Sequence, residues 1–213
     1  MLITFEGMDG CGKTTQAMLF ARYLSEIYGE NNVVLTREPG GTSFNELLRE
    51  MVLCSTDYKA DSTTELLLFL ATRRESFSKI INNALRQNKI VVSDRCIDST
   101  VAYQGYGHGI SLELIEQLNE IVTEGRSPDI TFVIDVPVEE SLSRASRNGY
   151  ESSDVDFYNR VRDGFRYVVE KNPHRCRLIQ CLESEEVNDI YDVHKKVVEL
   201  FNEHREAMRE NTE

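Results

Sequence analysis

A segment of eight residues near the N-terminus constrains this chain more than any other feature. Gly7-Met8-Asp9-Gly10-Cys11-Gly12-Lys13-Thr14 fits the pattern G-x-x-x-x-G-K-[ST] at every fixed position. A short apolar run, Leu2–Glu6, comes directly before it, and a helical apolar pattern follows. In such a loop the backbone N–H groups point inward at phosphate oxygens, and the positive N-terminal end of the next helix adds to them. The segment therefore predicts a site for a nucleoside triphosphate.

Three side chains near this loop have individual chemical roles. Lys13 can reach the β- and γ-phosphates, and the Thr14 hydroxyl can bind the Mg²⁺ that bridges them. A second apolar run ends in Asp94-Arg95. A carboxylate at that edge of a sheet can hold the Mg²⁺ shell, so Asp94 is the second expected metal ligand. The alternative for Asp94 and Arg95 is a surface ion pair.

Short runs rich in Val and Ile alternate with helical patterns along the whole chain. After Leu2–Glu6 they are Val33–Thr36, Ile90–Asp94, Ile130–Asp135 and Arg177–Cys181. Near-continuous apolar strands separated by helices indicate an α/β fold. We expect a P-loop-type parallel sheet of five strands with helices on both faces, as a single domain over residues 1–213. The segment Gly105–Gly109 holds three glycines, and it predicts a loop.

Charge and cysteine usage exclude several partner classes. The chain has 24 Lys and Arg against 36 Asp and Glu, a net charge of −12, whereas a binder of duplex DNA or anionic membranes needs a basic face. No stretch approaches the ~18 apolar residues of a membrane span. The number of cysteines is odd, five, and none has C-x-x-C spacing. We expect a cytoplasmic protein with no nucleic acid or membrane partner.

The motifs beyond the loop favour a small-molecule kinase over other nucleotide-binding classes. A GTPase reads guanine with Asn-Lys-x-Asp, and the nearest string, Asn88-Lys89-Ile90-Val91, lacks the Asp. A motor ATPase usually belongs to a larger chain. Here, arginines follow the strands where a second phosphate would need them: Arg95 after one strand, and Arg37 beside Glu38 after another. Pro39 and the paired glycines after it predict a rigid turn from which Arg37 and Glu38 project.

A helical stretch over residues 65–85 carries an arginine on its apolar stripe. Arg73 lies four residues after Phe69, so both side chains share one face of the helix. A buried arginine is costly unless it is paired with an anion or acceptors. Two interpretations remain: a structural arginine, or a base pocket in which Phe69 stacks and Arg73 bonds a ring carbonyl.

Taken together, these motifs resemble the bacterial thymidylate kinases over nearly the whole chain. The matching segments, in order, are Gly7–Thr14 with its Asp9, Thr36–Thr42, Phe69 with Arg73, Asp94-Arg95, Ser99–Gly105, Pro128–Asp135 and Asp156–Arg162. The resemblance implies ATP-dependent phosphorylation of deoxythymidine monophosphate (dTMP) to dTDP in dTTP synthesis, with Mg²⁺, by a homodimer. It covers more of the chain than the phosphate loop, which alone would mark any P-loop protein.

The resemblance also assigns residues. ATP would be bound by Gly7, Met8, Asp9, Gly10, Cys11, Gly12, Lys13, Thr14, Thr15 and Arg144. The dTMP site would hold Asp9, Arg49, Phe69, Arg73, Arg95, Thr100, Tyr103 and Gln104. Within that site Arg49 and Arg95 hold the acceptor phosphate, and Thr100 and Gln104 read the pyrimidine edge. Tyr103 crowds the 2′ position, and Glu38 with Asp94 helps to organise the metal and its water. The residues implied in catalysis are Asp9, Lys13, Glu38, Arg95 and Arg147.

Two positions depart from the family pattern. Cys96 follows Asp94-Arg95 where the family usually has an aromatic residue or histidine. Gly10 stands where the eukaryotic type has arginine, so the arginine for the transferring phosphoryl group should come from a short lid over residues 144–156. Arg147 is the first candidate and Arg144 the second. With Lys13, Arg37, Arg49, Arg73 and Arg95, they are seven basic residues expected to face one crevice.

Several other activities share the phosphate loop. Adenylate, guanylate and cytidylate/uridylate kinases lack the pairing of Phe69 and Arg73 with Tyr103-Gln104. A nucleoside kinase should place a carboxylate base where Arg49 and Arg95 stand. A non-catalytic nucleotide-dependent regulator is the alternative from a different class.

Overall fold

A parallel sheet of five strands lies at the centre of the described chain, in the order β2-β3-β1-β4-β5. The computed structural model describes residues 1–53, 60–146, 154–181 and 189–210. The strands are β1 (Leu2–Glu6), β2 (Val33–Arg37), β3 (Ile90–Asp94), β4 (Ile130–Asp135) and β5 (Cys176–Gln180). The predicted α/β fold with a five-stranded parallel sheet is confirmed, and the last strand lies one residue earlier than expected.

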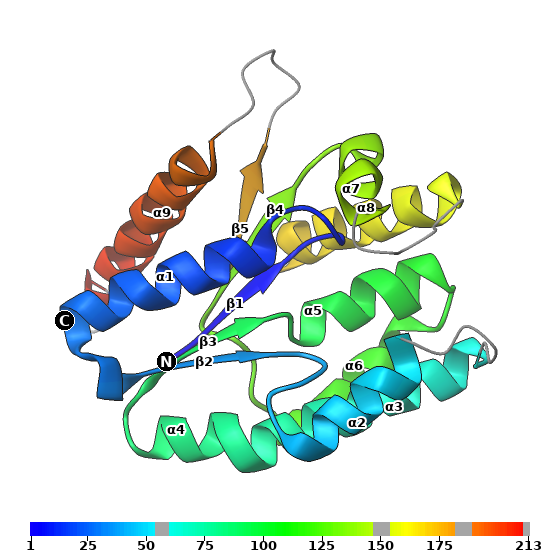
Figure 1. The fold of residues 1–213 in the computed structure, drawn as a ribbon, viewed down its shortest axis with the longest axis horizontal. Coiled ribbons are helices and arrows are strands. Elements are labelled where there is room, and N and C mark those ends of the chain that lie inside the picture. The colour runs from blue at the N-terminus through cyan, green and yellow to red at the C-terminus, as the bar shows by residue number, and fades with distance from the viewer. Residues whose placement is uncertain (54–59, 147–153, 182–188, 211–213) are drawn as a thin grey trace.

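One face of the sheet is covered by α1 (Lys13–Tyr28) and α9 (Ile190–Glu210), which lie toward the viewer in Figure 1. Side chains alternate along a strand, so Ile3 and Phe5 of β1 both point to this face. Phe20 of α1 packs against Phe5 at 5.7 Å between ring centroids and against Phe201 of α9 at 5.1 Å. These contacts fix the direction of α1, and with it the start of the helix at the phosphate loop.

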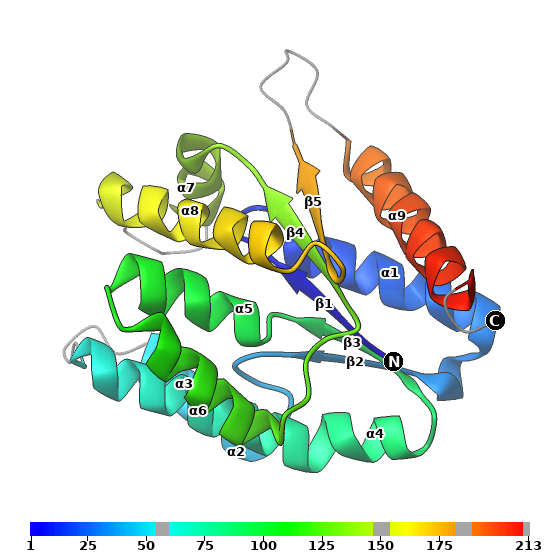
Figure 2. The ribbon, with the colours of Figure 1, turned by 180° about the vertical axis from the view of Figure 1, so that it is seen from behind.

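The opposite face carries the π-helical turn η2 (Phe77–Ile81) with α4 (Asn82–Arg86), then α5 (Ile97–Thr100) with the π-helix η3 (Val101–Gly107), and α8 (Val155–Lys171). Figure 2 shows α5 and α8 on this side. Leu2 of β1 packs here against Phe77 and Ile81. Glu6 of β1 also points to this face, toward α5.

The remaining helices extend the molecule beyond the sheet. They are α2 (Ser43–Leu53), α3 (Ser62–Ser76), α6 (Leu112–Thr123), α7 (Val138–Ser146) and the short 3₁₀ turn η1 (Glu30–Asn32). Asp61 begins α3 by accepting the N–H groups of Thr63 and Thr64. Within the described ranges, no helix has the length and apolar character that crossing a membrane requires.

The loop predicted over Gly105–Gly109 is helical in its first half, and that prediction is wrong there. Gly105 and Gly107 belong to η3. A Cβ atom at Gly105 would lie 2.5 Å from Leu112, and one at Gly107 would lie 2.6 Å from the Phe157 ring. These glycines therefore allow close packing of a helix against its neighbours. Of the three, only Gly109 has a positive φ, +76°.

Candidate active site

The phosphate loop joins β1 to α1 and is packed between the layers of the fold. Met8 and Cys11 are buried in the apolar clusters on opposite faces of the sheet. Gly12 precedes α1 with φ +93°, a conformation that only glycine adopts without strain. A Cβ atom at Gly10 would lie 2.3 Å from the carbonyl oxygen of Ser141, so α7 packs directly on the loop. Ser141 Oγ also donates to the Asp9 carbonyl at 2.5 Å.

Asp9 joins two cations at the centre of the loop. Its carboxylate accepts from Arg95 Nη2 at 2.6 Å and lies 3.4 Å from the buried ammonium of Lys13, which also donates to the Met8 carbonyl at 3.2 Å. The Tyr103 hydroxyl donates to the other carboxylate oxygen at 3.1 Å. Burial alone would raise the pKa of Asp9, but the charges of Arg95 and Lys13 outweigh it and hold the pKa below its ordinary value. Asp9 is thus a fixed anion between two cations.

Arg95 is held from several sides. Its backbone has φ +74°, and its guanidinium donates to the Gly7 carbonyl at 3.2 Å and to Ser99 Oγ at 2.8 Å. It also lies 5.0 Å from the centroid of the Tyr103 ring. The guanidinium therefore points along the edge of the phosphate loop in a defined orientation.

Thr14 and Asp94, the two predicted metal ligands, are in direct contact. The Thr14 hydroxyl donates to Asp94 Oδ2 at 2.5 Å. The other carboxylate oxygen of Asp94 is buried and has no hydrogen-bond partner among the residues of known placement. An ionised oxygen without a donor is a ready ligand for a cation. This pair of side chains fits a Mg²⁺ ion that is held partly by substrate phosphates.

Glu38 turns inward after β2 and pairs with Arg73, instead of projecting from the turn as predicted. Arg73 Nε donates to Glu38 Oε2 at 2.8 Å, and both side chains are buried. The same guanidinium donates to Thr100 Oγ1 at 2.6 Å, to Asn119 Oδ1 at 2.7 Å and to the Cys96 carbonyl at 2.7 Å. Burial raises the pKa of Glu38, and the charge of Arg73 opposes this rise. Four of the five guanidinium N–H groups are thereby used, so Arg73 has the partners that a buried cation requires.

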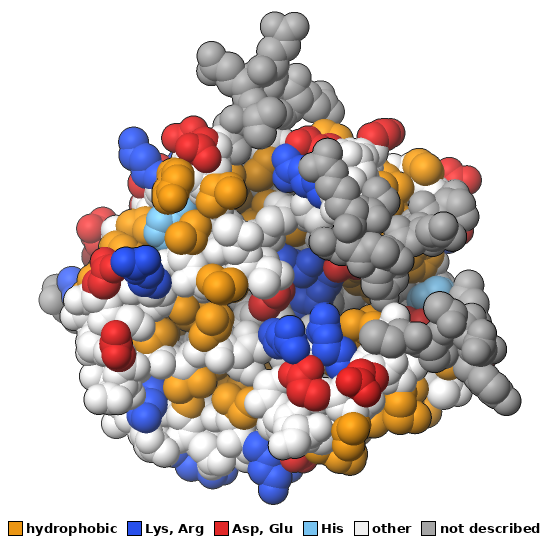
Figure 3. All heavy atoms as spheres, viewed as in Figure 1, with side chains coloured by type: hydrophobic (Ala, Val, Ile, Leu, Met, Phe, Trp, Pro, Cys, Tyr) orange, Lys and Arg blue, Asp and Glu red, His pale blue; other side chains and the backbone are white. Residues whose placement is uncertain are grey.

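These groups surround a cavity of about 220 Å³ at the carboxyl ends of β1, β2 and β3. Figure 3 shows basic and acidic side chains gathered near the centre of this face. The lining residues are Asp9, Lys13, Thr14, Arg37, Glu38, Arg49, Asp94 and Arg95. The cavity can thus bind phosphate groups on the loop and, across from it, a second anion beside the arginines.

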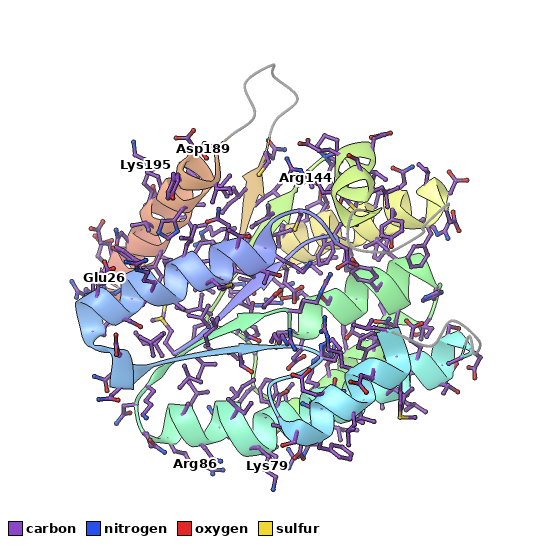
Figure 4. All side chains as sticks on the ribbon, in the orientation of Figure 1. Glu26, Lys79, Arg86, Arg144, Asp189 and Lys195 are labelled. Carbon is purple, nitrogen blue, oxygen red and sulfur yellow. The ribbon has the colours of Figure 1, made fainter. Side chains whose placement is uncertain are left out.

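Four of the seven basic residues expected in one crevice line this cavity: Lys13, Arg37, Arg49 and Arg95. Arg49 also donates to the Pro39 carbonyl at 2.7 Å. Arg73 does not line the cavity, because it is bonded to the inner side of Glu38. Arg144 is partly exposed on α7 (Figure 4). It pairs there with Glu140, one turn earlier. Arg147, like residues 148–153 of the predicted lid, lies outside the described residues.

The predicted base-binding residues come from α3 and from the continuous helix formed by α5 and η3. Arg73 and Thr100 are in contact, and Phe69 is half-buried one turn before Arg73. Gln104 is buried and donates to Glu65 of α3 at 2.8 Å. Thr15 is exposed at the start of α1, beside the loop. None of the four predicted base-binding residues lines the phosphate cavity, and Arg73 is linked to it through its hydrogen bond with Glu38.

Sequence reasoning missed Glu6, Ser99 and Ser141 at this site. Glu6 is buried at the end of β1 and accepts from Ser99, which contacts Arg95. The available signal was a charged residue at the end of a strand that carries no other charge. Sequence reasoning also missed the ion pairs of Asp135, whose carboxylate contacts Arg162 at 2.6 Å and Arg166 at 2.9 Å.

Known proteins are similar to this chain along almost its whole length. The family model described as "Thymidylate kinase" matches residues 5–203. A thymidylate kinase of Anaplasma phagocytophilum is 62% identical over 203 residues, covering 94% of this chain and 92% of the relative. A thymidylate kinase of Ehrlichia chaffeensis is 57% identical, covering 94% of this chain and 98% of the relative.

A solved structure agrees with the sequence relatives. The crystal structure of thymidylate kinase from Ehrlichia chaffeensis superposes with a TM-score of 0.81 at 52% sequence identity, covering 94% of this chain and 98% of that one. The family model, the sequence relatives and the fold lead to the same conclusion. The chain belongs to the thymidylate kinase family, the nucleoside monophosphate kinases that phosphorylate dTMP to dTDP with ATP.

Proposed function

We propose that the chain transfers the γ-phosphoryl group of ATP to the phosphate of dTMP in the cavity beside the phosphate loop. The observation that carries this assignment is the second set of cations: Arg37, Arg49 and Arg95 line the cavity in addition to Lys13. Transfer between two phosphates brings two polyanions together, so both must be neutralised and aligned. A loop that only bound or hydrolysed a nucleotide would need no such second set.

The donor ATP binds to the loop over residues 7–15. Its phosphates receive the backbone N–H groups of the loop and the N-terminal end of α1. Lys13 exchanges its contacts with Asp9 and the Met8 carbonyl for the β- and γ-phosphates. Arg144 and Arg147, three residues apart in the segment proposed as the lid over residues 144–156, supply positive charge to the donor and the transferring group.

Thr14 and Asp94 hold Mg²⁺ together with the phosphates of ATP. The unpartnered oxygen of Asp94 supports this placement. No group of three or more His, Cys, Asp or Glu side chains with metal-site geometry occurs in the placed part of the chain. A single carboxylate, that of Asp94, beside the phosphates of ATP suits Mg²⁺, which proteins bind through one or two carboxylates plus substrate phosphates. When bound, the ion neutralises the charge that develops on the phosphate oxygens.

The acceptor dTMP places its phosphate between Arg49 and Arg95 and its base toward α3. Phe69 stacks on the thymine ring, Arg73 donates its remaining N–H to the ring O4, and Thr100 and Gln104 read the rest of the edge. Tyr103 and Asp9 lie beside the sugar. The contacts of Arg73 with Thr100 and of Tyr103 with Asp9 support this arrangement, because they bring the proposed groups to one side of the cavity.

Two copies of the chain form a homodimer through an apolar surface on α2, α3 and α6. Phe44, Leu47 and Met51 lie at helical spacing on one side of α2 and are each more than half exposed. Leu67 of α3 and Ile121 of α6 are also exposed. Large exposed apolar side chains that gather on neighbouring helices indicate an interaction surface. We further propose that the whole chain acts as one domain in the cytoplasm.

A coupled assay of ADP release over a panel of nucleoside monophosphates tests the reaction. We expect dTMP to be the best acceptor, followed by dUMP and then UMP. ADP release that does not depend on any monophosphate, or a purine monophosphate as the best acceptor, would refute the assignment. Thymidine as a better acceptor than dTMP would indicate a nucleoside kinase instead.

A further inference from the structure

Glu6 is a buried carboxylate that the proposed reaction does not use directly. It is the last residue of β1, and its exposed fraction is 0%. Its carboxylate accepts from the backbone N–H of Cys96 at 2.7 Å, from the backbone N–H of Ser99 at 3.2 Å and from Ser99 Oγ at 2.5 Å. Burying a carboxylate is costly, so the contacts that it makes are the key to its role.

The hydrogen bonds from the backbone N–H groups of Cys96 and Ser99 to Glu6 shape the turn after β3. Cys96 precedes α5 and gives this helix no side-chain cap. The carboxylate of Glu6, which lies on the distant strand β1, instead accepts the backbone N–H groups of Cys96 and Ser99 at the start of the helix. The residue directly before this turn is Arg95, with φ +74°, a conformation that L-amino acids disfavour. Glu6 therefore stabilises the unusual backbone that aims Arg95 at the phosphate loop.

Ser99 connects Glu6 to the guanidinium itself. A serine hydroxyl has one proton and two acceptor sites. Since Ser99 donates its proton to Glu6, its acceptor sites face Arg95, and Arg95 Nη1 donates to Ser99 Oγ at 2.8 Å. The three side chains thus form a directed chain of hydrogen bonds, from Arg95 through Ser99 to Glu6.

We propose that Glu6, acting through Ser99, is the positioning residue for Arg95 and thereby for the phosphate of the acceptor nucleotide. The inference rests on the proposed function in one respect, namely that Arg95 holds the acceptor phosphate. Glu6 itself does not line the cavity, so it acts on the substrate through Arg95 and not by direct contact.

The protonation of Glu6 offers a readout that packing alone would not give. Burial, together with the charge of Asp98, raises the pKa of Glu6 to about 7 against the opposing charge of Arg95. Other groups close enough to interact with it are Arg73 of α3 and the thiols of Cys96 and Cys176. Only the ionised carboxylate accepts all three hydrogen bonds. We therefore expect the hydrogen bonds that hold Arg95 in place through Ser99 to weaken when Glu6 is protonated.

Steady-state kinetics on four variants test the proposal: Glu6→Gln, Ser99→Ala, Ser99→Thr and the double variant of Glu6→Gln with Ser99→Ala. We expect the first two to raise KM for dTMP about tenfold while KM for ATP stays within about twofold. Ser99→Thr retains the hydroxyl and should remain close to the parent enzyme. The double variant should be no worse than the worse single variant, because both break one chain of contacts.

The pH profile of kcat/KM for dTMP adds an independent measurement. The parent enzyme should lose activity as the pH falls through about 7. This limb should be absent in Glu6→Gln. The second ionisation of the substrate phosphate, near pH 6, is common to both enzymes and cancels in the comparison.

Asp129→Asn is the matched control, because the Asp129 carboxylate accepts the N–H of Leu2 at 2.6 Å at the other end of β1. We expect it to lower stability without a selective change in KM for dTMP. The proposal is overturned if Glu6→Gln and Ser99→Ala leave KM for dTMP unchanged, or if they raise KM for both substrates equally, as a loss of structure would. Should Glu6→Gln fail to fold, Ser99→Ala and Ser99→Thr decide alone.

Arg95→Ala separates this inference from the proposed function. If it leaves KM and kcat for dTMP unchanged, the placement of the acceptor phosphate at Arg95 is wrong and the inference fails with it, whereas the use of dTMP itself is refuted only by the monophosphate panel. If it impairs the use of dTMP but Glu6→Gln and Ser99→Ala do not, only the positioning role of Glu6 is refuted.

Discussion

Arg73 and Glu38 form a buried ion pair, with 2.8 Å between Arg73 Nε and Glu38 Oε2, that joins α3 to the turn after β2. Glu38 also lines the cavity, and its backbone N–H donates to the Asp94 carbonyl at the end of β3. The pair therefore connects the proposed base-binding side of the site to the proposed metal-binding side. Displacing one partner should disturb both.

We predict that Arg73→Ala destabilises the fold by about 3–5 kcal/mol, because it leaves the Glu38 carboxylate buried without its partner. Urea unfolding of the purified variant measures this. Arg74→Ala is the matched control on the same helix: Arg74 pairs with Glu124 at the surface, so its loss should cost less than about 1 kcal/mol. Equal losses in the two variants would contradict the role of the buried pair.

Lys13→Ala should abolish phosphoryl transfer while binding of dTMP persists, because the ammonium serves the phosphates of the donor. Isothermal titration with dTMP and the coupled ADP assay measure the two effects separately. Lys79→Ala, an exposed lysine on η2, is the control and should retain full turnover. Loss of dTMP binding together with loss of the fold would show instead that Lys13 supports the loop structurally.

Arg147→Ala should lower kcat on the order of 10³-fold with little change in ATP affinity, since an arginine that contacts the transferring group acts mainly in the transition state. Arg144→Ala should have a smaller effect, because Arg144 is already paired with Glu140. Single-turnover kinetics with a separate measurement of ATP binding distinguish the variants. Near-normal turnover in Arg147→Ala would move the role to Arg144.

Met51→Glu should convert the proposed dimer to a monomer, because a charge would be buried in the apolar surface on α2. Size-exclusion chromatography with light scattering measures the mass directly. Ile27→Glu, at a comparably exposed position on α1, should leave the mass unchanged. A parent protein that is already monomeric at micromolar concentration would rule out this interface.

The raised pKa of Glu6 predicts how stability depends on pH. Its pKa is about 7 in the folded protein and 4.5 in the reference state, so the folded protein holds this proton more tightly than the unfolded chain does. The free energy of unfolding should therefore fall by about 3 kcal/mol as the pH rises from ~4.5 to ~7, and should change little above that. Urea unfolding across this range should show the slope in the parent protein and not in Glu6→Gln. A slope of the opposite sign would contradict the assignment.

The strands could be predicted because each is a short, mostly apolar run between helical patterns. A strand of a parallel sheet is covered by helices on both faces, so most of its side chains are apolar and the strand is visible in the sequence as an apolar run. The phosphate loop was equally predictable, since its glycines, Lys13 and Thr14 are adjacent in sequence. These features depend on local order, which a single sequence displays directly.

The contacts that could not be predicted join residues far apart in the chain. Glu6 forms hydrogen bonds with Cys96 and Ser99, which lie about 90 residues later in the chain, and no local sequence pattern indicates these contacts. Gly105 and Gly107 have the composition of a loop, but their missing side chains make room for Leu112 and Phe157. In both cases tertiary packing decides the structure, and local propensity does not.

The direct packing of α7 on Gly10 has a consequence for how this enzyme can change over evolutionary time. Any side chain at position 10 would collide with the backbone of α7 before it could reach a phosphate. A lineage with this architecture therefore cannot gain a loop arginine by one substitution, because α7 would first have to move away. In this fold, close packing of α7 on the loop and an arginine at position 10 are therefore mutually exclusive.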